Sequence, residues 1–148
     1  ECKDSWLKEE YYHPDKKQGF SIWILHEEQD HSFCLSLQSW YKYLGAPPHN
    51  HGTWSITLVL EGKEKHNFYK DIYKPYPNIH PLELLDTVIC EAGVFIEMEK
   101  SNIHEVINVS DKTSLSLSFF GIRPSFSDRV QINPKTGEAA KFICKQEN

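Results

Sequence analysis

The sequence predicts an all-β protein, built as a sandwich of two sheets or as a closed barrel. Roughly ten short runs of strand-favouring residues follow one another at near-regular spacing, with turn residues between them. Aromatic residues, which favour strands over helices, make up 13% of the 148 residues. No convincing amphipathic helix follows residue 18. At this length we expect one domain, in which residues 1–18 form a short irregular or helical lead-in and residues 19–148 form the barrel.

The predicted elements begin with this polar lead-in, whose helical part ends before Pro14 because the residue preceding a proline rarely stays helical. The next run, Phe20–His26, is rich in β-branched and aromatic residues and predicts a strand. Ser32–Tyr43 alternates, as a strand does. One face of this second strand is small or polar except for Trp40, so it differs from an ordinary core-facing strand.

The middle of the chain predicts a hairpin, in which Thr53–Leu60 and Lys63–Tyr73 flank the turn pair Glu61-Gly62. Residues 74–85 contain three prolines and predict a connecting loop, although Leu82 to Asp86 can begin the next strand. Shorter strand runs then alternate with turn residues such as Glu91-Ala92-Gly93. These runs are Asp86–Cys90, Val94–Met98, His104–Val109, Ser114–Phe120, Arg129–Ile132 and Ala139–Cys144.

Charge and composition exclude several classes of protein. The net charge is −5 and no basic cluster occurs, which argues against nucleic-acid binding. No apolar run approaches membrane-spanning length. The four cysteines are widely spaced without a C-x-x-C pair, so we expect free, mostly buried thiols. The chain starts at Glu1 without a signal-peptide pattern. We expect a cytoplasmic monomer or homodimer.

Two histidines supply the first sign of a site. His49 and His51 lie two residues apart on a segment that leads into a strand, and this spacing places both imidazoles on the same face of a strand. A metal ion could be held between them. Further on, Gly62 lies eleven residues after His51, and Gly93 is followed eleven residues later by His104. His104 is in turn followed at +4 by Asn108.

These spacings resemble the two sequence motifs of the cupin family. The first motif is matched by Gly45, His49, His51 and Gly62, and the second by Gly93, His104 and Asn108. Ser55 stands where many cupins place a glutamate ligand, and Glu99 and Ser101 replace the proline and glycine of the second motif. The resemblance implies a double-stranded β-helix, or jelly-roll, barrel with a metal site formed by His49, His51 and His104.

Within the cupins, the chain is most similar to the cysteine dioxygenase-like group of thiol dioxygenases. The similarity is carried by the string Pro47–Trp54, by Trp40, and by the ending from Arg129 to Glu138. It implies a mononuclear non-haem Fe(II) site of three histidines, with a small thiol and O2 as the molecules it binds. Imidazole also suits Ni, Zn or Cu, so the ligand type alone does not select the metal, and Mn stays open as well.

The substrate side departs from that group. Its substrate-binding arginine aligns on Ile22 or Trp23, and the only cations near them in sequence are Lys16 and Lys17. A Ser-x-His-x-Tyr triad of the family aligns on Ser116, Ser118 and Phe120, and its cross-linking cysteine aligns on Ile56. We therefore expect a more apolar pocket. Its candidate residues are Trp40, Gln38, Ser116, Ser118, Phe120 and Tyr69.

The other histidines and acids are interpreted as structural or solvated. His26, His31, His66 and His80 have no partner at a ligand spacing. His66 and Tyr69 lie on opposite faces of one strand, and we expect Tyr69 to face the pocket. Glu64 is expected to be a solvated residue of the hairpin.

The sequence thus predicts an iron dioxygenase that oxidises a small thiol, but not cysteine itself because the arginine for its carboxylate is absent. Three alternatives remain open. The chain could be a cupin enzyme of another chemistry, a non-catalytic cupin that binds a small ligand, or a cupin that keeps a metal only for stability.

Overall fold

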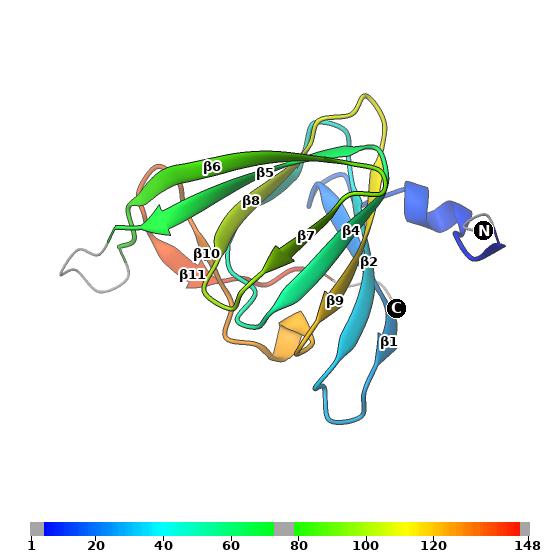
Figure 1. Cartoon of the computed structure of the whole chain (residues 1–148), viewed down its shortest axis with the longest axis horizontal. Helices are drawn as coiled ribbons and strands as arrows, with labels where there is room; N and C mark the ends of the chain where they lie inside the picture. The colour runs from blue at the N-terminus through cyan, green and yellow to red at the C-terminus, as the bar shows by residue number, and fades with distance from the viewer. Residues whose placement is uncertain (1–4, 73–78, 146–148) are drawn as a thin grey trace.

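The computed structural model describes residues 5–72 and 79–145, and these form two antiparallel sheets that face each other (Figure 1). The helical segments named in this part of the chain are short 3-10 turns, η2 (Glu9–Tyr12) and η3 (Pro124–Phe126). No helix among the described residues has the length and apolar character needed to cross a membrane. The predicted all-β class is confirmed.

Each sheet is assembled from segments that are distant in sequence. The five-stranded sheet contains, in spatial order, β1 (Phe20–Glu27), β2 (Cys34–Trp40), β9 (Ser114–Phe120), β4 (Ser55–Glu61) and β7 (Phe95–Met98). The six-stranded sheet contains β11 (Ala139–Lys141), β10 (Val130–Ile132), β3 (Gly45–His49), β8 (Ile103–Asn108), β5 (Lys63–Asp71) and β6 (Leu82–Glu91). Between β2 and β10, every connection except the β5–β6 hairpin passes from one sheet to the other. This alternation is the winding of a jelly roll.

The hydrophobic residues of β2 and its neighbours lie on two sides of the five-stranded sheet. Inside the barrel, Phe20, Trp40 and Phe142 pack together with ring centroids 5.1–6.5 Å apart. On the outer side, the lead-in covers the sheet with Tyr11, whose ring packs edge-on against Trp23. The lead-in therefore completes a second small core, and the polar face of β2 is left to face the barrel interior.

The predicted hairpin at Glu61-Gly62 is wrong. β4 and β5 belong to different sheets, so Gly62 is the corner at which the chain crosses between them. Its φ is +84°, and a Cβ there would lie 2.7 Å from Cβ of Ser114, so only glycine fits. The turn at Gly93, with φ +89°, is likewise a corner, because β6 and β7 lie in different sheets.

One strand is missing from the prediction. The sequence does not predict β3, because Pro47 and Pro48 within it argue against a strand. β6 begins at Leu82, the point at which the sequence allows the next strand to begin, so the connecting loop ends before residue 82; its residues 74–78 lie outside the described part. Of the cysteines, Cys34 and Cys90 are free and buried and Cys144 is free and half-buried, as predicted, while Cys2 lies outside the described residues.

Candidate metal centre

His49 is the last residue of β3 and lies opposite His104 of β8 in the antiparallel register. Nδ1 of His49 lies 2.7 Å from the carbonyl oxygen of Pro47. Because a carbonyl can only accept, the ring donates its hydrogen from Nδ1, and Nε2 keeps a free lone pair. The local backbone thus selects the tautomer that can bind a metal through Nε2.

His51 lies beyond the end of β3, in the loop that leads to β4. The expectation that both histidines share one face of a single strand is therefore wrong in detail. Nδ1 of His51 lies 2.7 Å from Oγ of Ser55, and the hydroxyl of Ser127 donates to the backbone oxygen of His51 at 2.7 Å. Ser55, at the position where many cupins place a glutamate, thus orients His51.

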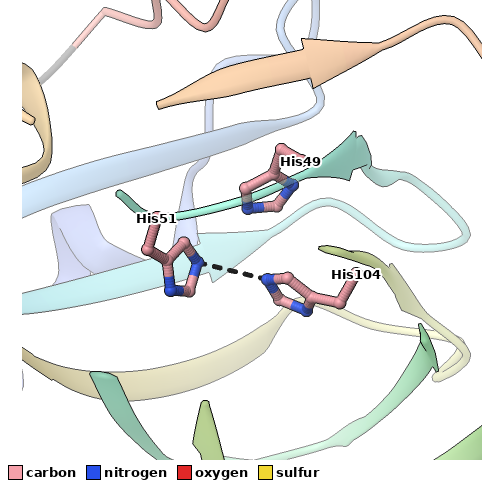
Figure 2. A group of neighbouring side chains, drawn as sticks. All are labelled: His49, His51 and His104. Carbon is pink, nitrogen blue, oxygen red and sulfur yellow. Dashed lines mark hydrogen bonds between the residues drawn. The ribbon is translucent and has the colours of Figure 1, made fainter. Parts of the chain in front are cut away.

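The rings of His49, His51 and His104 converge inside the barrel, as Figure 2 shows. One ring nitrogen of each residue lies within 4.8 Å of those of the other two. Nε2 of His104 is 3.1 Å from Nε2 of His51, the contact drawn as a dashed line in Figure 2. All three side chains are buried. The three residues singled out from the sequence therefore form one cluster.

Burial lowers the pKa of all three imidazoles. For His49 the pKa falls to about 4, mainly through desolvation, with the positive charge of Arg129 adding to the effect. Desolvation also lowers the pKa of His51 and of His104 well below the usual value, and the neighbouring histidines contribute. The rings are therefore neutral at physiological pH, which is the form that binds metals.

This burial makes the metal-free protein acid-sensitive. In the unfolded chain the histidines have the ordinary imidazole pKa of about 6.5, whereas the pKa of His49 in the folded chain is about 4. The free energy of unfolding should therefore decrease as the pH drops from about 6.5 to 4, and His49 alone should account for roughly 3 kcal/mol of this loss. Urea unfolding at several pH values measures it. A free energy that stays constant between pH 7 and 4.5 would contradict the prediction.

The donor set fits a divalent transition metal. Three neutral nitrogen donors on one side leave further coordination positions open toward the barrel interior. Each ligand also has its second ring nitrogen engaged, to the carbonyl of Pro47, the hydroxyl of Ser55 or the ring of His66. Such outer contacts orient the imidazoles of metal sites.

Beside the three histidines lies a small cavity of about 40 Å³, enough for a few water molecules. Five of the six pocket candidates line it: Trp40, Gln38, Ser116, Ser118 and Phe120. Ile56, the position aligned with the cross-linking cysteine, is 37% exposed, and the next residue, Thr57, lines the cavity instead. Among these residues, the aromatic rings form an apolar part of the cavity, and the hydroxyls and one amide form a polar part; Glu64, His66 and Arg129 also line it.

The polar groups of this wall satisfy one another. The hydroxyl of Ser118 donates to Oε1 of Gln38 at 2.8 Å and lies 2.7 Å from Oγ1 of Thr57. Nε2 of Gln38 donates to Oγ of Ser36 at 2.7 Å, and Nε1 of Trp40 donates to Oγ of Ser116 at 3.1 Å. This wall is therefore a fixed, uncharged surface.

The structure reverses the expected orientation of β5. Tyr69 does not line the cavity; it is half-buried, and its hydroxyl donates to Glu105 at 3.1 Å. His66 and Glu64 face inward, at 2% and 0% exposure. The expectation that Glu64 is solvated is wrong. The first half of β5 has polar residues on both faces, so the alternation of its residues does not indicate which face is buried.

The other histidines that were set aside lie at the surface. His26, His31 and His80 each pair with a carboxylate, from Glu28, Glu27 and Asp71 respectively. Their interpretation as surface residues is confirmed. His66 is the exception, because its ring lies behind His104.

Sequence reasoning also missed Arg129. This residue, 5% exposed, precedes β10 of the six-stranded sheet and lines the cavity. Its guanidinium carbon lies 4.5 Å from the ring centroid of Phe142, and one terminal nitrogen donates to Sγ of Cys144. No ion-pair partner for it occurs among the described residues, and its Nε is buried without a hydrogen bond. The strand after the lead-in contains no arginine, as predicted, but Arg129 brings one to the cavity from another part of the chain.

No protein-family model and no curated protein sequence matches the chain. Solved structures do match it. An oxalate oxidase in complex with the substrate analogue glycolate has a TM-score of 0.58 at 15% identity, over 72% of this chain and 53% of that one. KdgF from Halomonas sp. has a TM-score of 0.55 at 12% identity, over 74% of this chain and 84% of that one. An RmlC-like cupin from Shewanella frigidimarina has a TM-score of 0.51 at 15% identity, over 72% and 79%.

These similarities concern the fold. The chain has the jelly-roll barrel of the cupins, which confirms the predicted fold class. It covers only about half the length of the oxalate oxidase chain, 53%. At 12–15% identity, these structures show the fold alone. The fold and the geometry together establish a barrel of the cupin type that contains a cluster of three histidines suited to a metal.

Proposed function

We propose that the chain holds one divalent metal, Fe(II) in its working form, through His49, His51 and His104, and adds dioxygen to the sulfur of a small thiol. The observation that carries the proposal is the convergence of three neutral imidazoles without a carboxylate among the ligands. Ser55 orients His51 in place of the glutamate of other cupins. This donor set is the one implied by the similarity to the cysteine dioxygenase-like group.

The proposed reaction converts a thiol, RSH, and O2 into a sulfinic acid, RSO2H. Both oxygen atoms end on sulfur, which loses the four electrons that O2 gains, so no further reductant is needed. When bound, the iron provides a path for these electrons between sulfur and dioxygen. The chain's own part is to hold the thiol beside the three histidines and to exclude water, with Phe120 and Phe142 packed against the ligand rings.

The cavity favours a small thiol that carries a carboxylate but no ammonium group. Arg129 is a buried cation without an ion-pair partner among the described residues, and a carboxylate would satisfy it. The oxygens of Gln38, Ser118 and Thr57 are hydrogen-bonded to one another and carry no charge. An ammonium group placed at this wall would meet no charged partner there, because Glu64, the carboxylate that lines the cavity, lies on β5 and faces His66 at 3.6 Å. A mercapto acid therefore fits better than cysteine.

Oxygen consumption by the Fe(II)-loaded protein tests the proposal. We expect one O2 per thiol oxidised, a sulfinate product, and a kcat/KM for 3-mercaptopropionate or mercaptoacetate at least about fivefold above that for cysteine, since one unsatisfied polar group costs about 1 kcal/mol or more. Brisk oxidation of cysteine would contradict the substrate assignment. Tight metal binding without oxygen uptake on any thiol would favour a non-catalytic cupin that binds a small ligand.

A second candidate function is metal-assisted chemistry on a small carboxylate that has no sulfur. Arg129 is the observation that favours it, because this residue recognises an anion and not a thiol. The similar oxalate oxidase structure contains glycolate, described there as a substrate analogue. Oxygen uptake with glycolate or oxalate in the absence of any thiol would support this candidate over the first.

A further inference from the structure

The inner face of β5 places two polar side chains directly behind the histidine cluster. Glu64 is fully buried and His66 is 2% exposed, and both line the barrel interior. Neither carboxylate oxygen of Glu64 has a hydrogen-bond partner among the described residues, and the same holds for Nε2 of His66. A buried carboxylate is costly unless a positive charge or a donor compensates it.

His66 connects Glu64 to His104. Nδ1 of His66 lies 3.3 Å from Nδ1 of His104, and the two rings are nearly parallel, with 4° between their planes. On its other side, Nε2 of His66 lies 3.6 Å from Oε2 of Glu64, which is within ion-pair distance though longer than a hydrogen bond. The three side chains therefore form a continuous row that ends at the nitrogen of His104 facing His51.

Metal binding at His104 would set the direction of every hydrogen in this row. A neutral imidazole carries one N–H, so a metal on Nε2 of His104 leaves the hydrogen on Nδ1. That hydrogen faces Nδ1 of His66, which must accept it. His66 then carries its own hydrogen on Nε2, the atom that faces Glu64. Each donor thus points away from the metal and toward the carboxylate.

We propose that Glu64 and His66 are positioning residues that form a relay behind His104 and strengthen its bond to the metal. The negative charge of Glu64 polarises both rings and partly balances the metal charge, which the ligand set, with no carboxylate, leaves uncompensated. His49 and His51 differ, because their Nδ1 atoms face the neutral oxygens of Pro47 and Ser55. The relay rests on the proposed metal site but on no particular substrate.

Zinc affinity, measured by competition with a chelator, tests the relay without any turnover. Glu64→Gln keeps the shape of the side chain and removes its charge, and we expect a 10- to 100-fold loss of zinc affinity, roughly what outer contacts of metal ligands contribute. The matched control is Glu105→Gln, the same change on β8 beside His104 but with a side chain bonded to Asn67 and Tyr69 outside the cavity. This control should bind zinc within about twofold of the wild type.

The stability of the metal-free chain separates the relay from a purely structural role. Removing an unpartnered buried charge should leave the metal-free Glu64→Gln protein as stable as the wild type or more stable. Wild-type zinc affinity in a folded Glu64→Gln protein would overturn the relay alone. A wild-type chain that binds no zinc would overturn the metal site and the relay together.

Nitrogen-15 spectra of the imidazoles in the zinc-loaded wild type provide a second test that needs no variant. We expect the hydrogen of His104 on Nδ1 and that of His66 on Nε2. A zinc-loaded protein in which His66 carries its hydrogen on Nδ1 would overturn the proposed direction of the row.

Discussion

Replacing His104 with alanine is expected to abolish tight metal binding and to reduce oxygen consumption below detection. With one of three donors gone, the remaining pair should bind at least about 100-fold more weakly, because each ligand of a protein metal site contributes several kcal/mol. His49 and His51 would also lose the ring that packs between them and His66. Metal content after dialysis and chelator competition measure the change directly.

Thermal unfolding measures the loss of metal binding in His104→Ala independently. At a metal concentration 100 times its dissociation constant, binding stabilises a protein by about 2.7 kcal/mol, which corresponds to a rise in Tm of roughly 5–10 °C for a domain of this size. The wild type should show this rise and His104→Ala should not. The control is His26→Ala, because His26 is exposed and pairs with Glu28 at the surface. Equal metal-induced shifts in both variants would refute the assignment of His104.

The histidine cluster could be predicted because the spacing between the histidines and the turn glycines reflects the lengths of the strands. His49 lies opposite His104 in the register of β3 and β8, and no local pattern reveals that pairing. Only the resemblance to the two cupin motifs connected them. The same spacing accounts for Asn108, whose side chain donates to the backbone oxygens of Trp40 and Lys112 and so fixes the end of the ligand-bearing strand.

The incorrect predictions for the turn at Gly62 and for β5 have a common physical origin. In both cases the local sequence allows two structures, and the pairing of distant strands determines which one forms. Glu61-Gly62 has the composition of a hairpin turn, yet a glycine at positive φ serves a corner between sheets equally well. On β5, the inner face contains Glu64 and His66 and the outer face Lys65 and Asn67, so polarity could not identify the buried side. Only the pairing of β5 with β8, which brings His66 next to His104, identifies the face of β5 that is buried.

Arg129 was missed for a related reason. The family resemblance predicts a substrate-binding arginine on the strand after the lead-in, where this chain instead has Ile22 lining the cavity. The structure supplies the charge from a segment more than a hundred residues later, because β10 pairs with β3 next to His49. Because the guanidinium comes from a different segment than in the cysteine dioxygenase-like group, a carboxylate bound to Arg129 would lie in a different orientation in the cavity.

Replacing Arg129 with glutamine should raise the KM for a mercapto acid by roughly 100-fold, because a buried Arg–carboxylate pair that loses one partner costs about 3 kcal/mol or more. The turnover number should change much less, since the metal ligands remain. The comparison substrate is 2-mercaptoethanol, a thiol of similar size without a charge. Its KM should be unaffected by Arg129→Gln, so the preference of the wild type for the mercapto acid should disappear.

The chain offers one matched control, because it contains only one other arginine. Arg123 pairs with Glu27 on the outside of the barrel and does not line the cavity. Arg123→Gln makes the same chemical change and should leave both KM values within about twofold. If Arg129→Gln raised the KM of the charged and the uncharged thiol equally, the residue would only shape the cavity. If neither KM moved, the substrate would not contact Arg129 at all, and the carboxylate in the proposed substrate would lose its support.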